Sequence, residues 1–143
     1  MIRKKVFALM LLPALSFAAT PVGLWKTIDD KTGKEKSLVR ITENSGILSG
    51  SIEKLLDPNV KKDALCGACS DDRKGKPIAG LNIIRGLKQN GSESDVWEGG
   101  NILDPKNGKV YKARIKVIES GKKLELRGYL GPFYRTQVWQ KAD

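Results

Sequence analysis

Short runs in which apolar and polar residues alternate follow one another from residue 21 to the end of the chain. The clearest run covers residues 110–118, in which Tyr111, Ala113, Ile115 and Val117 alternate with basic residues. A period of two places apolar side chains on one face of a strand and polar side chains on the other. This pattern predicts antiparallel sheet with one solvated face, and it disfavours a fold built of helices.

Eight such runs can be delimited, with glycine, asparagine or aspartate between most of them, at residues 22–28, 36–43, 46–55, 78–87, 95–103, 109–118, 123–131 and 134–140. Three connections, at 44–46, 105–108 and 120–122, have the composition of tight turns, so neighbouring strands should pair in sequence order. Eight sequential antiparallel strands close most economically into an up-and-down barrel, which leaves no exposed sheet edge. A two-sheet sandwich is the alternative.

The first eighteen residues have a basic start at 3–5, an apolar run and small residues before position 19. This order is typical of a secretory signal peptide cleaved after Ala18. A transmembrane helix needs roughly 20 apolar residues, and this run is shorter and contains Pro13. We therefore expect a signal peptide at 1–18 and a single barrel domain at 19–143. The mature form should lack a transmembrane span and be periplasmic or secreted, in a Gram-negative bacterium.

The two cysteines, Cys66 and Cys69, lie in a connection of about twenty residues, 57–77, which is much longer than the tight turns. An oxidising compartment favours a disulfide between them. A redox-active pair is an alternative, but a thioredoxin-like motif would lie in a βαβ pattern that this chain lacks. Another alternative is that the two cysteines supply half of the ligands of a metal site. Zinc would need two more nitrogen or sulfur ligands, and the chain has no histidine and no third cysteine. We expect no metal and no cofactor.

The lack of histidine also excludes Ser-His-Asp and Cys-His catalysis. The adjacent carboxylates Asp29 and Asp30, and likewise Asp71 and Asp72, would diverge in an extended chain, and we interpret both pairs as solvated loop residues. We assign no catalytic residue, and an enzyme is disfavoured. A minority hypothesis would use the cysteine pair in thiol exchange or Asp71 in hydrolysis.

Glycine and tryptophan at the start of the first strand, with arginine and tryptophan in the last, resemble the arrangement of the calycin superfamily, which includes the lipocalins and the fatty-acid-binding proteins. The residues concerned are Gly23, Trp25, Arg135 and Trp139. The resemblance implies that they close one end of the barrel, with Trp25 packed against Arg135. Physical chemistry agrees, because an indole face attracts a guanidinium group.

Nearly all of the chain after residue 18 is similar to a bacterial exported family known as domain of unknown function 2147. The similarity rests on motifs in order along the chain: Gly23-Leu24-Trp25-Lys26-Thr27, Gly46-Ile47-Leu48-Ser49-Gly50, Cys66-x-x-Cys69, Lys76-Pro77-Ile78-x-Gly80, Trp97-x-Gly99-Gly100, Ile102-Leu103-Asp104-Pro105, Gly108-Lys109-x-Tyr111, Arg127-Gly128-Tyr129 and Arg135-Thr136-x-x-Trp139. It implies a calycin-like barrel and export, but no reaction.

Three further large aromatic residues, Trp97, Tyr111 and Tyr129, either fill the barrel core or line a pocket for an apolar molecule. We expect a non-enzymatic protein in which they bind a small hydrophobic or amphipathic ligand, with the long loop as a lid. The alternative is a protein-interaction or envelope-stress module, or an inhibitor, that acts through the long loop.

The chain is basic, with 26 Lys+Arg against 16 Asp+Glu, and residues 19–143 carry +7 because three of the basic residues lie at 3–5. The positive charge is spread over outer strand faces, through Lys112, Arg114, Lys116, Lys122, Lys123 and Arg127. A basic surface attracts anions, so anionic envelope components are candidate partners. Nucleic acid is not expected, because the aromatic residues are spread over several strands instead of alternating with basic residues on one face.

Overall fold

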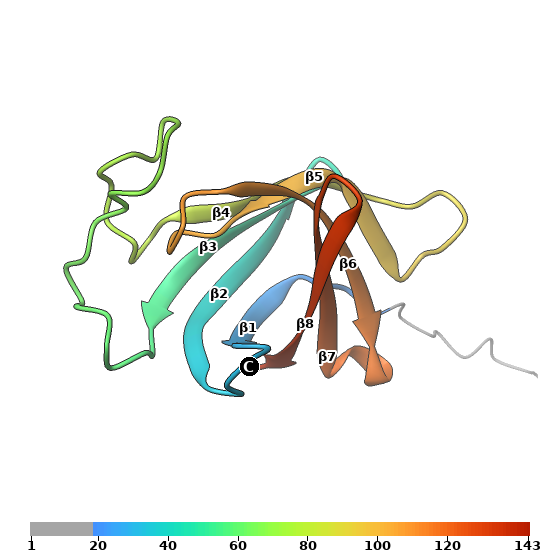
Figure 1. The fold of residues 1–143 in the computed structure, drawn as a ribbon. Helices are drawn as coiled ribbons and strands as arrows, with labels where there is room; N and C mark the ends of the chain where they lie inside the picture. The colour runs from blue at the N-terminus through green and yellow to red at the C-terminus, as the bar shows by residue number, and fades with distance from the viewer. Residues whose placement is uncertain (1–18) are drawn as a thin grey trace, which may run out of the picture.

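The computed structural model describes residues 19–143, which form a closed antiparallel barrel with its eight strands in sequence order (Figure 1). The strands are β1 Gly23–Ile28, β2 Glu35–Asn44, β3 Ile47–Leu55, β4 Asn82–Gln89, β5 Val96–Leu103, β6 Val110–Ile118, β7 Lys123–Leu130 and β8 Phe133–Lys141, with a short 3-10 turn, η1, at Glu119–Gly121. The up-and-down barrel predicted from the alternation is confirmed, and the sandwich alternative is wrong. The expected signal peptide, 1–18, lies outside the described residues.

The alternation on β6 corresponds to the inner and outer faces of the barrel wall. Ala113, Ile115 and Val117 are buried, and Tyr111 is half-buried at the start of the same row. Ile115 pairs with Trp97 of β5, so the inner row of one strand continues into the next. β1, β2, β3 and β7 show the same alternation, and the buried side chains of the inner faces meet in one core. No helix within 19–143 has the length and apolar character needed to cross a bilayer.

The fourth strand begins later than the sequence pattern predicts. β4 starts at Asn82, whereas the run of apolar residues suggested a start at residue 78. Gly80 has φ +89, a left-handed conformation that ends an extended run, and its N–H donates to the carbonyl of Ile52 at 2.7 Å. Residues 78–81 therefore belong to the connection that joins β3 to β4.

The sequential topology gives the barrel two different ends. In the up-and-down topology, the connections that follow β1, β3, β5 and β7 lie at the same end, which we call the loop end because it carries the long 56–81 connection. The start of β1, the end of β8 and the other three connections lie at the opposite end, which we call the tryptophan end.

The barrel is closed by a short seam between its first and last strands. β1 pairs with β8 only through Trp25 with Lys141 and Lys26 with Gln140, whereas β7 and β8 pair along their whole common length. Both pairs of the seam lie near the tryptophan end. Toward the loop end, β1 and β8 have no ladder between them in the described residues.

Candidate binding site at the loop end of the barrel

The tryptophan end is filled by large side chains. Trp25, Trp97 and Trp139 are all buried there, on β1, β5 and β8. The Trp25 Nε1–H donates to the carbonyl of Pro21 at 2.8 Å, and the Trp139 Nε1–H donates to Gln137 Oε1 at 3.1 Å. This end therefore presents packed indoles and offers no entrance.

The expected packing of Arg135 on Trp25 is not found. The register pairs Trp25 with Lys141, whose Nζ lies 5.4 Å from the centre of the Trp25 ring. Arg135 lies six residues earlier on β8, which is about 20 Å along the strand. Gly23, Trp25 and Trp139 are thus at one end of the barrel, and Arg135 is near the other.

The middle of the barrel is also filled. Two inner-face glycines, Gly50 and Gly128, have their space occupied by neighbouring side chains. A Cβ at position 50 would lie 2.9 Å from Ile84 Cδ1, and a Cβ at position 128 would lie 3.4 Å from Tyr111 Cβ. Cavities of about 200 and 230 Å³ are found outside the core, beside η1 and beside β4. The barrel centre is thus a packed core, as is common for eight-stranded barrels.

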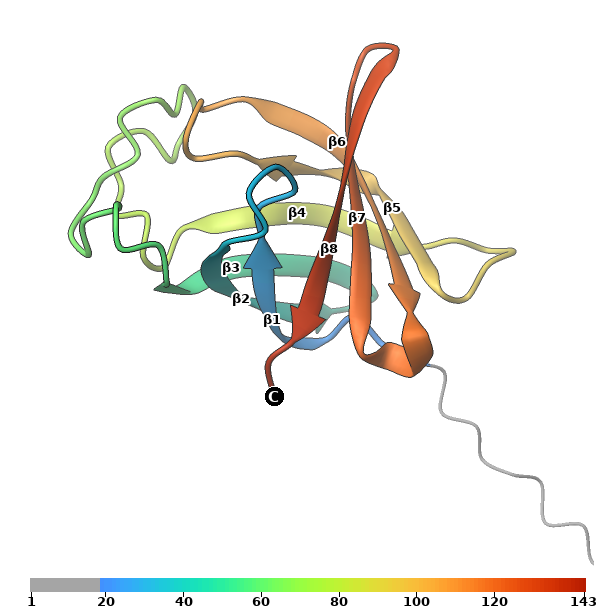
Figure 2. The same cartoon turned by 60° about the horizontal axis from the view of Figure 1, so that its bottom comes forward.

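The inner face of the β7–β8 hairpin continues beyond this core at the loop end. Leu124 pairs with the buried Trp139, and steps of two along each strand keep to the same face. The pairs that follow on this face toward the turn are Leu126 with Gln137, Gly128 with Arg135, and Leu130 with Phe133. Leu130 is 50% exposed and Phe133 is 75% exposed. The hairpin extends past the rest of the barrel rim (Figure 2). Its inner apolar side chains at the tip are therefore left uncovered.

Arg135 bridges the part of the barrel where β1 and β8 have no ladder. Its guanidinium forms an ion pair with Asp30 in the β1–β2 turn, with Nε donating to Oδ2 at 3.2 Å and Nη2 donating to Oδ1. Desolvation alone would raise the pKa of Asp30, but hydrogen bonding and attraction from Arg135 outweigh it and lower that pKa. The hydrogen bond from Arg135 to Asp30 in turn raises the pKa of Arg135. Both groups are therefore charged at neutral pH.

A buried polar pair lies near this end on the neighbouring strands. The hydroxyls of Thr27 on β1 and Ser37 on β2 are 2.8 Å apart, and the Ser37 N–H donates to Thr27 Oγ1 at 3.1 Å. Each hydroxyl is thus satisfied within the barrel wall. The inner face of the loop end consequently combines polar, cationic and apolar groups.

The three predicted ligand residues do not form one site. Trp97 lies at the tryptophan end, and its indole N–H has no hydrogen-bond partner among residues 19–143. Tyr111 lies on the inner face near the loop end, and its hydroxyl accepts from Asn107 Nδ2 at 3.0 Å. Tyr129 pairs with Lys112 on the outer face, and its ring centre lies 5.9 Å from that of Tyr134. Of the three residues, Tyr111 alone lies on the inner face of the loop end.

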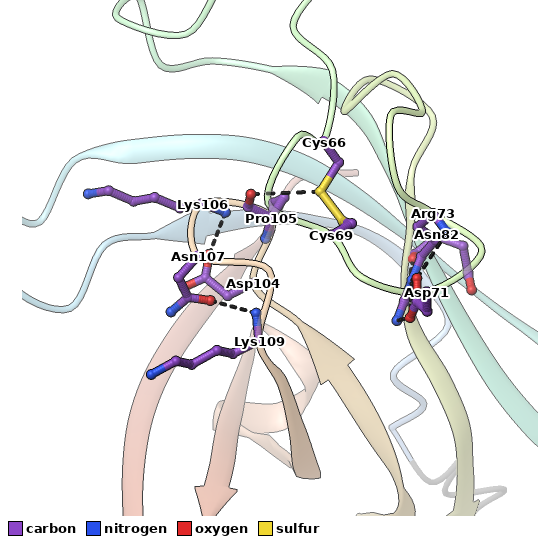
Figure 3. Close-up of a disulfide and its surroundings, with 10 residues drawn as sticks. All are labelled: Cys66, Cys69, Asp71, Arg73, Asn82, Asp104, Pro105, Lys106, Asn107 and Lys109. Atoms are coloured by element: carbon purple, nitrogen blue, oxygen red, sulfur yellow. Dashed lines mark hydrogen bonds and ion pairs between the residues drawn. A yellow bond between two sulfur atoms is a disulfide. The ribbon is translucent and has the colours of Figure 1, made fainter.

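The predicted disulfide between Cys66 and Cys69 is confirmed. Both cysteines are buried, and Cys66 Sγ lies 3.8 Å from the carbonyl oxygen of Pro105 in the β5–β6 turn (Figure 3). Thiol exchange requires an accessible sulfur for attack by a thiolate. The burial therefore favours a structural disulfide that holds the long loop against one side of the rim.

Asp71 and Asp72 anchor the other half of the long loop. Asp71 pairs with Arg73, which is 3% exposed and also donates to the carbonyl of Asn82 at 2.9 Å. Asp72 pairs with Arg85 of β4 at 3.0 Å. Hydrogen bonds from these arginines lower the pKa of each carboxyl. Both carboxylates are exposed, as expected of loop residues, but they fasten the loop to β4 (Figure 3 shows Asp71 and Arg73).

The comparisons with known proteins agree with this architecture. The family model of uncharacterized proteins conserved in bacteria, DUF2147, matches residues 23–141. No curated protein matches the chain in sequence. Among solved structures, protein HP1028 from the human pathogen Helicobacter pylori, described as belonging to the lipocalin family, is similar with a TM-score of 0.74 and 18% identity. The match covers 88% of this chain and 85% of that chain. At this identity the likeness concerns the fold, which is a lipocalin-like barrel.

Proposed function

This chain belongs to the DUF2147 family, and from that premise and the geometry of its lipocalin-like barrel we propose that it binds a small amphipathic molecule without catalysing a reaction. The observation that carries the proposal is the inner face of the β7–β8 hairpin, where the uncovered Leu130 and Phe133 lie beside Arg135. The apolar chain of such a molecule would pack on Leu130 and Phe133. Its anionic head group would bind the guanidinium of Arg135.

The ligand would lie at the rim of the barrel and not deep inside it. The tryptophan end is closed and the middle is packed, so a long apolar molecule has no room along the axis. Tyr111 forms the floor of the proposed site, because its half-buried ring lies on the inner face next to the Gly128 position. Ligand binding is thus expected at the loop end, and not in the interior that the aromatic residues of the sequence suggest.

Arg135 retains donors for a ligand while it is paired with Asp30. A guanidinium carries five N–H donors, and the hydrogen bonds to Asp30 come from Nε and Nη2. The Nη1 group is left for a carboxylate or phosphate oxygen. This arrangement favours a ligand with one negative charge at the end of an apolar chain.

Calorimetry with laurate and with its uncharged glycerol ester, both below their aggregation concentrations, tests the proposal. We expect laurate to bind, and Arg135→Gln to weaken its binding roughly tenfold because a charge-assisted contact is lost. The matched control is Arg40→Gln, which removes a half-buried arginine paired with Glu53 on the outer face. Absence of laurate binding, or an equal loss in both variants, would count against the site.

We also propose that the protein acts outside the cytoplasm. The signal-peptide pattern of residues 1–18 and the disulfide support this location. Cell fractionation with mass measurement of the purified chain tests it. The expected mass is that of a chain beginning at Ala19. A chain that still begins at Met1 and is found in the cytoplasmic fraction would contradict the proposal.

A further inference from the structure

The tip of the β7–β8 hairpin carries successive rungs of different chemistry. The rungs, from the turn downward, pair Leu130 with Phe133, Tyr129 with Tyr134, Gly128 with Arg135, and Arg127 with Thr136. Phe133 at the tip is 75% exposed and Tyr134 is 59% exposed. An apolar rung is thus followed by a tyrosine rung and then by two rungs with arginine.

We infer that this tip docks on a lipid surface that carries negative charge. Successive rungs are about 3.3 Å apart, so the four rungs extend over about 10 Å. A bilayer presents the same order of chemistry from inside to outside, since tyrosines prefer the interface and cations prefer the phosphate level. Proteins that bind at the interface bury apolar side chains about 5–10 Å deep, which matches the height of the tip. Figure 2 shows that the turn stands clear of the other connections.

The charges around the tip complement an anionic surface. Lys112 is exposed on the outer face directly opposite Tyr129. Arg127 lies with its Cζ 4.6 Å from the centre of the Tyr134 ring, and its pairing with Glu125 is a long 3.8 Å. Together with Arg135, these residues form a cationic collar below the apolar tip. Residues 19–143 as a whole carry a net charge of +7, which adds long-range attraction to anionic lipid.

The same charges disfavour a second copy of the chain as the occupant. In a two-fold symmetric dimer each patch meets its own copy, so two collars of Lys112, Arg127 and Arg135 would face each other at short range. Like charges repel most strongly where solvent is excluded. An apolar tip with these cations below it is therefore better matched to a surface of phosphates.

Sedimentation with lipid vesicles tests the inference. The protein is purified from the compartment in which it accumulates and mixed with vesicles of phosphatidylcholine, alone or with added phosphatidylglycerol. We expect binding to the mixed vesicles, with a loss on addition of salt because the charges are screened. Phe133→Ser should lower the vesicle-bound fraction roughly tenfold, since an apolar side chain no longer enters the membrane.

The matched control is Ile47→Ser, which removes an apolar side chain that is 40% exposed at the tryptophan end. It should bind vesicles as the parent does. Far-ultraviolet circular dichroism establishes that both variants are folded. Equal binding of Phe133→Ser and the parent would overturn the inference, as would a folded parent protein that does not bind the mixed vesicles. A concentration-dependent dimer that Phe133→Ser abolishes, without vesicle binding, would instead assign the tip to self-association.

A fluorescence experiment locates the tip in the membrane. The three native tryptophans are buried, so an indole introduced by Phe133→Trp is accessible to a quencher. Brominated lipid should quench it and should leave an indole introduced by Ile47→Trp unquenched. The inference shares Phe133 and Arg135 with the proposed ligand site. The two ideas are tested separately, because laurate binding is measured in solution without vesicles. Loss of one activity with retention of the other identifies which idea fails.

Discussion

The backbone of Gly108 in the β5–β6 turn lies directly against the carbonyl group of Ala68 in the disulfide loop. A Cβ atom at position 108 would be 1.8 Å from that oxygen, and Gly108 has φ +72. The β1–β2 turn and the β5–β6 turn contain the same local hydrogen bond. The Gly33 N–H donates to the backbone carbonyl of Asp29, and the Gly108 N–H donates to the backbone carbonyl of Asp104, each at 2.8 Å. Gly33 has φ +71 but no atom near its Cβ position. The two glycines thus differ in their surroundings and not in their backbone.

We predict that Gly108→Ala destabilises the fold far more than Gly33→Ala. Gly33→Ala adds only the cost of a left-handed residue, about 1–2 kcal/mol. Gly108→Ala adds a backbone clash and should cost about 3 kcal/mol or more. Urea unfolding of both variants measures the difference. Similar midpoints for the two would show that the loop moves away from the turn at little cost.

Removal of the disulfide should destabilise the protein without removing a chemical activity. Closing so short a loop contributes about 1–3 kcal/mol, and Cys66→Ala with Cys69→Ala should lose this amount in urea unfolding. Alanine avoids the placement of a buried hydroxyl in the core, where both sulfurs are buried. Ready reduction of the folded protein by a small thiol would contradict a purely structural disulfide.

The carboxylates of the long loop should make stability fall in acid. The pKa values of Asp71 and Asp72 are lowered in the folded state by their arginine partners, so the folded state holds fewer protons than the unfolded chain near the ordinary value of about 3.9. Their contribution is present above that pH and is lost as the pH falls through the lower folded values. The urea midpoint of Asp71→Asn should therefore fall less between pH 7 and pH 3 than that of the parent. Asp63→Asn, which changes an exposed carboxyl in the same loop, is the matched control.

Asp30 competes with a bound anion for Arg135 under the proposed function. Asp30→Asn should free the guanidinium and strengthen laurate binding a few-fold, whereas Arg135→Gln weakens it. Glu53→Gln, which removes one carboxylate partner of Arg40 on the outer face, should leave laurate binding unchanged. Weaker laurate binding by Asp30→Asn would mean that Asp30 is needed to position the arginine.

The alternation of the sequence was sufficient to predict the strands, because a half-buried strand imposes a period of two on its residues. The pattern predicts too early a start for the fourth strand because residues 78–81 continue the apolar run, whereas the left-handed Gly80 ends the extended backbone. Propensity alone does not reveal which conformation a glycine adopts.

The site was predicted less well than the fold, for two reasons. The partner of Arg135 depends on the register between β1 and β8, which are far apart in sequence and are not aligned by a turn. Tyr129 was placed inside because it is aromatic, although counting in twos from the inner Leu124 and Leu126 puts it outside. The same count leads to Leu130 and, across the hairpin, to Phe133. The alternation of the sequence therefore indicates these two residues as the inner face of the hairpin tip.

The two-pair seam between β1 and β8 has a consequence for how the chain folds. All other strand pairings join neighbours in sequence and can form as hairpins, whereas the seam joins residues more than 100 positions apart and must wait for the rest. The edges of β1 and β8 are thus held together at two places: near the tryptophan end by the pairing of Trp25 with Lys141, and near the loop end by the ion pair of Asp30 with Arg135. If both contacts break, the edges of β1 and β8 become exposed together. Exposed edges of this kind allow a terminal strand to be exchanged between two copies of the chain.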